Sequence, residues 1–236
     1  MIGFGKAGKT LAAKLSSQEK KKVALIEKSK SMYGGTCINI ACIPTKTLIV
    51  AAEKGLDFEQ AMNEKNAVTT RLNGKNYATI AETGVDIIDA TARFVSNKVI
   101  EIQAGDEKEE LTAETIIINT GAVPTILPIP GLAESKFAVD STGIQRLENL
   151  PKRLGVLGGG PIGLEFAHLY NTLGSQVTVL DASEAFLPRI EPSIAALAKG
   201  YLEEDGIQFL QGVHTQEIKD GDHSLTVVTD KGNFEF

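Results

Sequence analysis

The chain has 236 residues, of which 42% are hydrophobic and 23% charged, and this ordinary balance excludes a disordered or fibrous protein. The formal net charge of -6 argues against a broad basic surface for nucleic acid or anionic lipid. No stretch approaches the ~18 uninterrupted apolar residues of a membrane span, and the N-terminus has no signal core, so we expect a cytoplasmic protein without a membrane partner.

The first half of the chain begins with half of a βαβ unit. Apolar residues at helical spacing predict a helix over residues 7–15, and a short apolar run predicts a buried strand over 23–26 that ends at Glu27. Two helices, a strand meander, a proline-punctuated linker and a short helix are then predicted, in that order, over residues 36–55, 58–82, 85–120 and 120–131 and from Ser141.

The second half repeats the plan of the first. A strand over 154–157, a helix over 161–173 and a strand over 177–180 lead to Asp181. A helix over 192–204 follows, and four strands are predicted over 208–210, 217–218, 225–228 and 233–236. We therefore predict an α/β fold of two Rossmann-like domains, residues 1–150 and 151–236, with a β-meander inserted in the first.

Two glycine fingerprints of the form G-x-G-x-x-G each open a predicted helix. Gly3, Gly5 and Gly8 form the first, and the second consists of Gly158, Gly160 and Gly163. In such motifs the glycines allow a tight turn, a close approach of backbone to a pyrophosphate, and close helix packing. A carboxylate able to bind a ribose follows each motif roughly 20 residues on, Glu27 and Asp181 respectively. The pair predicts two dinucleotide sites, although glycines that serve only turns remain the alternative.

The second carboxylate indicates the preferred nicotinamide cofactor. Asp181 is followed by Ala-Ser-Glu, without a basic residue to neutralise a 2'-phosphate. The site therefore favours NADH over NADPH.

The two cysteines, Cys37 and Cys42, suggest redox chemistry. Two thiols without a flanking His are too few for a structural zinc site, so no metal is predicted. In an ideal helix their Cα atoms would lie roughly 8.6 Å apart, beyond the ~7 Å limit for a disulfide. A bridge therefore needs a distorted helical turn, which the preceding glycines and Pro44 permit. Both cysteines being small buried core residues is the alternative.

The segment GGTCINIACIPTK, residues 34–46, resembles the redox-active C-x-x-x-x-C motif of the FAD-dependent class I pyridine nucleotide-disulfide oxidoreductases. This family includes dihydrolipoamide dehydrogenase, glutathione reductase and mercuric reductase. IGFGKAGKT, VALIEKS, MYGGTCINI, INTGAVP, DSTG, LGGGPIGLEFA and AFLPR carry the resemblance along the chain. They are most similar to a branch of bacterial reactive-chlorine resistance flavoproteins associated with reducing oxidants such as hypothiocyanous acid.

The resemblance implies FAD at the first fingerprint, a nicotinamide cofactor at the second, and a small oxidant or disulfide as substrate. It makes Cys37 the interchange thiol that faces substrate and Cys42 the charge-transfer thiol beside the flavin. Lys46 would lie near flavin N5, paired with Glu165. Further FAD contacts are implied at Gly35, Thr36, the backbone of Ala92, Thr120 and Gly121. For Lys46 and Glu165 the alternative is a surface role. For the function, the alternatives are a dihydrolipoamide dehydrogenase or mercuric reductase-type activity, a non-catalytic nucleotide-binding protein with structural cysteines, and a flavin-free redox or metal-sensing module.

The sequence also departs from the family pattern. Ala41 replaces a usual glycine between the cysteines, and Pro161 replaces a residue that is often aromatic and can gate the nicotinamide pocket. The family's acid-base His belongs to a C-terminal dimerisation domain that these residues do not contain. We therefore expect residues 1–236 alone to be inactive, and the full-length form to be a homodimer.

Overall fold

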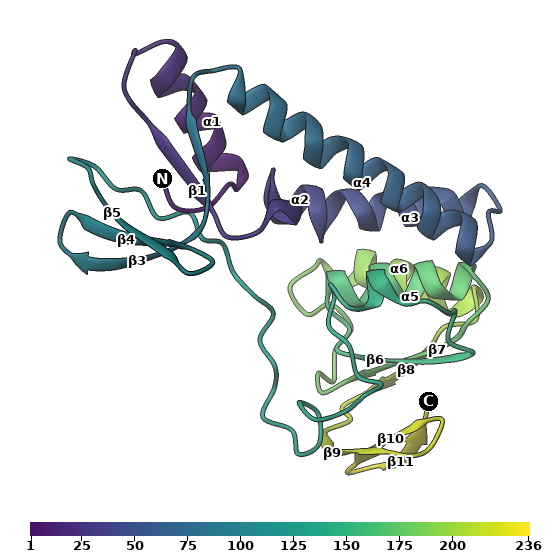
Figure 1. Ribbon diagram of the computed structural model, residues 1–236. Coiled ribbons are helices and arrows are strands. Elements are labelled where there is room, and N and C mark those ends of the chain that lie inside the picture. Colours follow the sequence, from purple (N-terminus) through teal and green to yellow (C-terminus); the bar gives the residue numbers. More distant parts are fainter. The chain divides into compact units, whose positions relative to one another are not determined.

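A computed structural model describes residues 1–236, which divide into two compact units (Figure 1). The first consists of Met1–Lys46 and Lys65–Val123, and the second of Thr47–Glu64 and Pro124–Phe236. These units are interleaved along the chain, whereas the predicted domains 1–150 and 151–236 are continuous segments. That domain division stays a prediction.

The first unit contains the first half-repeat and the meander. Its helices and strands are α1 (Lys6–Ser17), β1 (Ala24–Glu27), the 3-10 turn η1 (Lys30–Met32), α2 (Thr36–Asn39), the start of α3 (Cys42–Glu53), most of α4 (Phe58–Ala81), β2 (Asp86–Asp89), β3 (Thr91–Ser96), β4 (Val99–Ala104) and β5 (Glu107–Thr112).

In the first unit, the residues that lead into the first glycine fingerprint pair with a small parallel sheet. β1 and β2 are parallel, with Ala24 opposite Asp86 and Glu27 opposite Asp89. Ile2 forms parallel bridges to both Ile26 and Ile118, so the residues before Gly3 run between β1 and the segment around Ile118. This arrangement places the first glycine turn at the carboxyl end of β1, where dinucleotides bind in such sheets.

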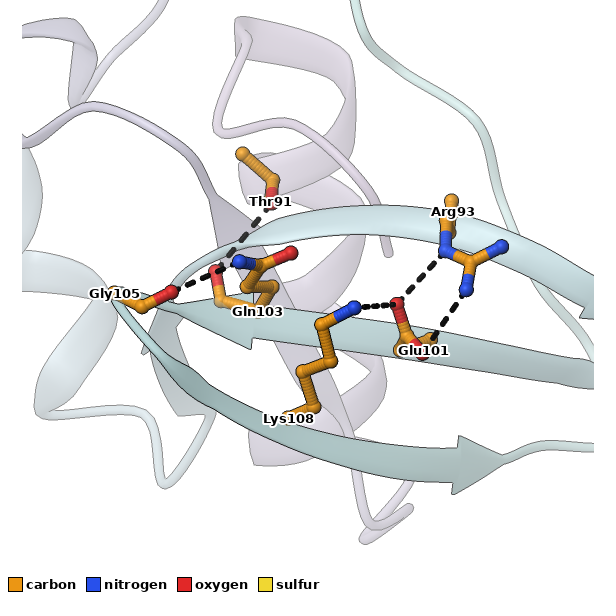
Figure 2. A network of polar contacts seen from close by, with 6 residues as sticks. All are labelled: Thr91, Arg93, Glu101, Gln103, Gly105 and Lys108. Atoms are coloured by element: carbon orange, nitrogen blue, oxygen red, sulfur yellow. Dashed lines mark hydrogen bonds and ion pairs between the residues drawn. The ribbon is translucent and has the colours of Figure 1, made fainter.

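The meander forms a separate antiparallel sheet in the order β3-β4-β5. Figure 2 shows its polar face, where the Arg93 guanidinium contacts both oxygens of Glu101, at 2.7 and 3.1 Å. Lys108 from β5 lies 3.6 Å from the same carboxylate. Because Glu101 lies on the middle strand β4, its carboxylate pairs with cations on both neighbouring strands. Ile100 and Ile102, on either side of Glu101 in the sequence, are buried in the core.

The second unit contains the other half-repeat. Its elements are the rest of α3, the start of α4, the 3-10 turn η2 (Ile144–Arg146), β6 (Arg153–Leu157), α5 (Pro161–Thr172), β7 (Gln176–Asp181), α6 (Pro192–Glu204), β8 (Gln208–Gln211), β9 (Thr215–Asp220), β10 (Leu225–Thr229) and β11 (Gly232–Glu235).

The sheets of the second unit explain its core. β6, β7 and β8 form a parallel sheet in chain order, and β9, β10 and β11 form an antiparallel one. Buried residues of α5 and β7, including Phe166, Tyr170 and Val179, pack in one cluster with Leu48 of α3. Leu48 explains why residues 47–64 belong to this unit.

The predicted fold class is confirmed, with two corrections to its elements. The predicted helix over 36–55 is interrupted at Ile40 and Ala41, between α2 and α3. The meander ends at Thr112 and not at residue 120. In the segment that follows, Ile118 forms an isolated bridge to Ile2, a long-range parallel pairing that local alternation does not reveal.

Residues Thr36–Glu53 are long and apolar enough to cross a membrane by length and composition, with a mean hydropathy of 1.2. The break between α2 and α3 falls within this stretch, and Leu48 and Ala51 belong to a core cluster. No single continuous helix therefore covers this stretch, and α3 alone is shorter than the ~20 residues that a membrane span needs.

Candidate functional site

The first glycine fingerprint forms a tight turn that side chains would not fit. Gly3 has a φ of +103°, and a Cβ added there would lie 2.2 Å from the backbone oxygen of Asn119. At Gly8, an added Cβ would lie 2.9 Å from the carbonyl oxygen of Gly3. The Asn119 side chain donates to that same carbonyl at 3.2 Å. The turn therefore requires glycine at its first and third positions, as the fingerprint predicts.

Glu27 is fixed beside this turn by two backbone donors. The buried amide of Phe4 donates to one carboxylate oxygen at 2.9 Å, and the amide of Ser29 donates to the other at 3.1 Å. The side chain is thereby held at the end of β1, and each carboxylate oxygen keeps a further lone pair that could accept a ribose hydroxyl.

The second fingerprint repeats this geometry. Gly158 also has a φ of +103°, and a Cβ at Gly163 would lie 2.3 Å from the Gly158 carbonyl oxygen. Asp181 accepts from the amides of Gly159 and Ser183, both at 3.0 Å. The same two sequence positions thus supply the donors to the carboxylate in each half of the chain.

The starts of α1 and α5 suit a diphosphate. Gly5 and Gly160 are their N-caps, neither cap has a side-chain hydrogen bond, and no acidic residue lies in either first turn. Free amides and the positive end of the helix dipole therefore face outward. A Cβ at Gly160 would meet nothing within 4 Å, so this approach path is open. The residues fit two dinucleotides.

The cysteines lie together because the helix is broken between them. Ile40 leaves helical geometry at φ -142° and ψ 9°, and α3 begins at Cys42 with Pro44, which is tolerated in a first turn. Both thiols are exposed and unbridged. A hydrogen bond to the Cys42 thiol, followed by burial, raises the pKa of Cys37. A distorted turn thus separates the two cysteines although they are unbridged, and the two exposed thiols are not the buried core residues of the alternative.

Backbone contact joins the cysteine segment to the first fingerprint. Gly35 has a φ of +81°, and a Cβ there would lie 2.6 Å from the Cα of Gly5. The predicted contact residues Thr36 and Gly121 also meet, since a Cβ at Gly121 would lie 3.8 Å from the Thr36 hydroxyl oxygen. The segment that carries Cys37 therefore lies against the first predicted dinucleotide site.

The remaining predicted site residues lie in both units, and their roles stay predictions. Ala92 lies in β3 and packs against a core cluster, and Thr120 precedes Gly121 in the irregular segment. Lys46 lies in α3 within the first unit, and Glu165 in α5 within the second. Their pairing stays a prediction.

Comparisons with known proteins agree with this geometry. The family model described as pyridine nucleotide-disulphide oxidoreductase matches residues 1–235. The chain belongs to this family.

Three relatives within the pyridine nucleotide-disulphide oxidoreductase family illustrate the similarity. The probable pyridine nucleotide-disulfide oxidoreductase RclA of Escherichia coli is 43% identical over 228 residues, which are 96% of this chain and 52% of RclA. A dihydrolipoyl dehydrogenase of Mycoplasma pneumoniae is 32% identical over 89% of this chain and 49% of its own. A mercuric reductase of Staphylococcus aureus is 30% identical over 96% of this chain and 43% of its own.

Solved structures support the same family fold. The HOCl-induced flavoprotein disulfide reductase RclA from Escherichia coli superposes with a TM-score of 0.94 at 42% identity, over 99% of this chain and 53% of that one. The chain therefore spans about half the length of the curated relatives that it matches.

Sequence reasoning missed the residues that stiffen this family site. Asn119 fronts all three glycines of the first fingerprint, and its only signal was membership of the motif INTGAVP. Asn39 donates to the carbonyls of Tyr33 and Gly35 and accepts from Asn73 at 3.0 Å. Such polar links depend on distant residues meeting, which local pattern does not show.

Proposed function

We propose that the protein is an FAD-dependent disulfide reductase that takes electrons from NADH and reduces a small oxidant through Cys37 and Cys42. The observation that carries this proposal is the pair of adjacent thiols at the broken helix, whose segment rests on the first glycine turn. A purely nucleotide-binding protein has no need of two exposed thiols in this position.

Residues of the two fingerprints would hold the cofactors. Glu27 would accept hydroxyls of the FAD ribose, and the start of α1 would meet the FAD diphosphate. Asp181 and the start of α5 would do the same for the nicotinamide dinucleotide. When bound, FAD supplies the means to pass two electrons from the nicotinamide to the cysteine pair.

The chain's own residues suit the thiol half of the reaction. Cys37 lies in α2 and Cys42 opens α3, so the break gives each sulfur a different helix start and leaves both exposed. The Cys42 amide contact lowers the pKa of Cys37, opposing the larger effect of the thiol hydrogen bond and burial. Once formed, a Cys37 thiolate can attack a substrate while Cys42 stays within reach to displace the product.

The preferred substrate of this proposal is hypothiocyanous acid or a related reactive chlorine species. Support comes from the 43% identity to RclA, whose solved structure is described as HOCl-induced, against 32% and 30% for the other two relatives. The Cys37 thiolate would attack the sulfur of hypothiocyanous acid, forming an S–S bond as the S–O bond breaks and hydroxide leaves to become water. Cys42 thiolate would then form the disulfide and expel thiocyanate, so that the two cysteines lose two electrons.

NADH is the nicotinamide cofactor that the second fingerprint favours. Both oxygens of Asp181 accept backbone amides, so the carboxylate is held at the position where a 2'-phosphate would lie. Its charge would repel that phosphate, and Ala182 supplies no compensating cation.

Reductive titration tests the proposal. Two-electron reduction of the flavin-loaded protein with dithionite should produce a long-wavelength charge-transfer band. In Cys37→Ser, which cannot form the disulfide, the band should be present already in the oxidised protein and be lost when two electrons reduce the flavin. In Cys42→Ser the band should be absent. Absence of the band from the unaltered protein would contradict the proposal. Where the band is present, steady-state assays with hypothiocyanous acid, lipoamide and mercuric ion would distinguish the three candidate substrates.

A further inference from the structure

The first turns of α1 and α2 diverge from one point of backbone contact. A Cβ at Gly35 would lie 2.6 Å from the Cα of Gly5 and 3.5 Å from the amide nitrogen of Lys6. Lys6 is the first residue of α1, and Cys37 is the second residue of α2. The glycine contact therefore brings the start of the helix that carries Lys6 close to the start of the helix that carries Cys37.

A second lysine is fixed on the same side of α1. Lys9 lies one turn after Lys6 and donates a hydrogen bond from Nζ to the side-chain oxygen of Asn76 in α4. Asn76 also donates to the Leu72 carbonyl at 2.7 Å, so α4 orients the amide that receives Lys9. This hydrogen bond holds the Lys9 ammonium in a partly buried position.

The charges of these groups act on one another. Burial and then Lys6 lower the pKa of Lys9, while Cys37 raises it. The charge of Lys6 lowers the pKa of Cys37, against the stronger effect of Cys42 and burial. Cys42 and Lys6 are thus titratable groups that act on the Cys37 thiol, and Cys37 in turn acts on Lys9.

We propose that Lys6 and Lys9 form a cationic wall beside Cys37, and that this wall selects small oxidants that are anions or leave an anion behind. Resting on the function proposed above, the inference adds two positioning residues to the cysteine pair. A cation near Cys37 stabilises its thiolate, and it also favours an approaching anion or a departing thiocyanate. An uncharged disulfide also expels an anionic thiolate, so the wall distinguishes an anionic oxidant from it only as the oxidant approaches.

The test compares an anionic and a neutral alkylating agent with the same leaving group. Iodoacetate and iodoacetamide react with Cys37 in the flavin-loaded full chain carrying Cys42→Ser, with the site of alkylation read by peptide mass spectrometry. Lys6→Gln should lower the ratio of the iodoacetate to the iodoacetamide rate by about threefold, the size expected for one partly screened charge. Lys9→Gln should lower it less, and Lys14→Gln, an exposed lysine near the end of α1, should leave it unchanged.

A pH profile separates this role from a purely structural one. Because the Lys6 charge favours the Cys37 thiolate, the pH at which the iodoacetamide rate is half-maximal should rise in Lys6→Gln and stay unchanged in Lys6→Arg. Added salt should also lower the rate ratio when both lysines are present, which decides the matter even if Lys6→Gln fails to fold.

Two results would overturn the inference. One is an equal rate ratio in the lysine variants and the Lys14→Gln control, or a ratio indifferent to salt. The other is loss of flavin from Lys6→Gln with no change in the ratio or the pH midpoint, which would assign Lys6 to the FAD diphosphate. Either result leaves the charge-transfer test of the proposed function unaffected, so the two failures are distinguishable.

Discussion

Gly160 and Gly163 offer a matched pair of substitutions that separates cofactor binding from folding. Gly160 has φ -76° and ψ 171°, a conformation open to any residue, and a Cβ there would meet nothing within 4 Å. Gly160→Ala should therefore leave the fold intact or stabilise it by about 0.4–1 kcal/mol, because the unfolded chain loses freedom. Any harm it does must come from the ligand that approaches this backbone.

The expected loss falls on dinucleotide affinity. A methyl group in the path of the pyrophosphate should weaken NAD⁺ binding at least tenfold, which corresponds to about 1.4 kcal/mol. Gly163→Ala should instead lower the stability of the fold. Its Cβ would lie 2.3 Å from the Gly158 carbonyl and 3.2 Å from Val156, so the turn must shift at a cost of about 2 kcal/mol in the free energy of unfolding.

Calorimetric titration with NAD⁺ and chemical denaturation followed by circular dichroism would measure both effects, since the chain has no Trp. Unchanged NAD⁺ affinity in Gly160→Ala would refute the placement of the pyrophosphate at the start of α5. Unchanged stability in Gly163→Ala would refute the packing argument for the third glycine.

Two further predictions concern the second unit. In the full-length form, Asp181→Ala combined with Ala182→Arg should move the kcat/KM preference from NADH toward NADPH, by removing a repulsive charge and adding a phosphate partner; a fixed ratio would contradict the role of Asp181. Burial raises the pKa of Tyr170, so its protonated form favours folding and its stabilising effect, complete below about pH 10, should decline as pH rises further. Tyr170→Phe removes the 2.6 Å hydrogen bond to the Ile144 carbonyl and should cost about 1 kcal/mol at neutral pH while weakening that alkaline decline, as urea titrations at several pH values would show.

Local pattern predicted the repeated part of the fold well. The two G-x-G-x-x-G motifs announce their own turns, and hydrophobic period places α1, β1, α5 and β7 within two or three residues. The break between α2 and α3 was not predicted, because helical spacing indicated one helix over 36–55 and a distorted turn was expected only for a bridged cysteine pair.

What failed depends on contacts distant in the chain. The pairing of Ile118 with Ile2 and the packing of Leu48 with the second unit bring together segments that no window of sequence contains. The same reason hid Asn119 and the lysines near Cys37. Their chemistry is set by the glycine turns that bring separate elements together, so their residue type alone carries no signal.

The most direct test of the central claim follows the redox state of the cysteine pair itself. The flavin-loaded full-length protein, oxidised and freed of excess oxidant, is treated anaerobically with one equivalent of NADH, and its thiols are trapped and mapped by mass spectrometry. We predict a Cys37–Cys42 disulfide before NADH and two trapped thiols after it, with no such change in flavin-free protein. NADH oxidation that leaves the pair unchanged, or an oxidant-dependent NADH turnover in Cys42→Ser equal to that of the unaltered protein, would contradict the account.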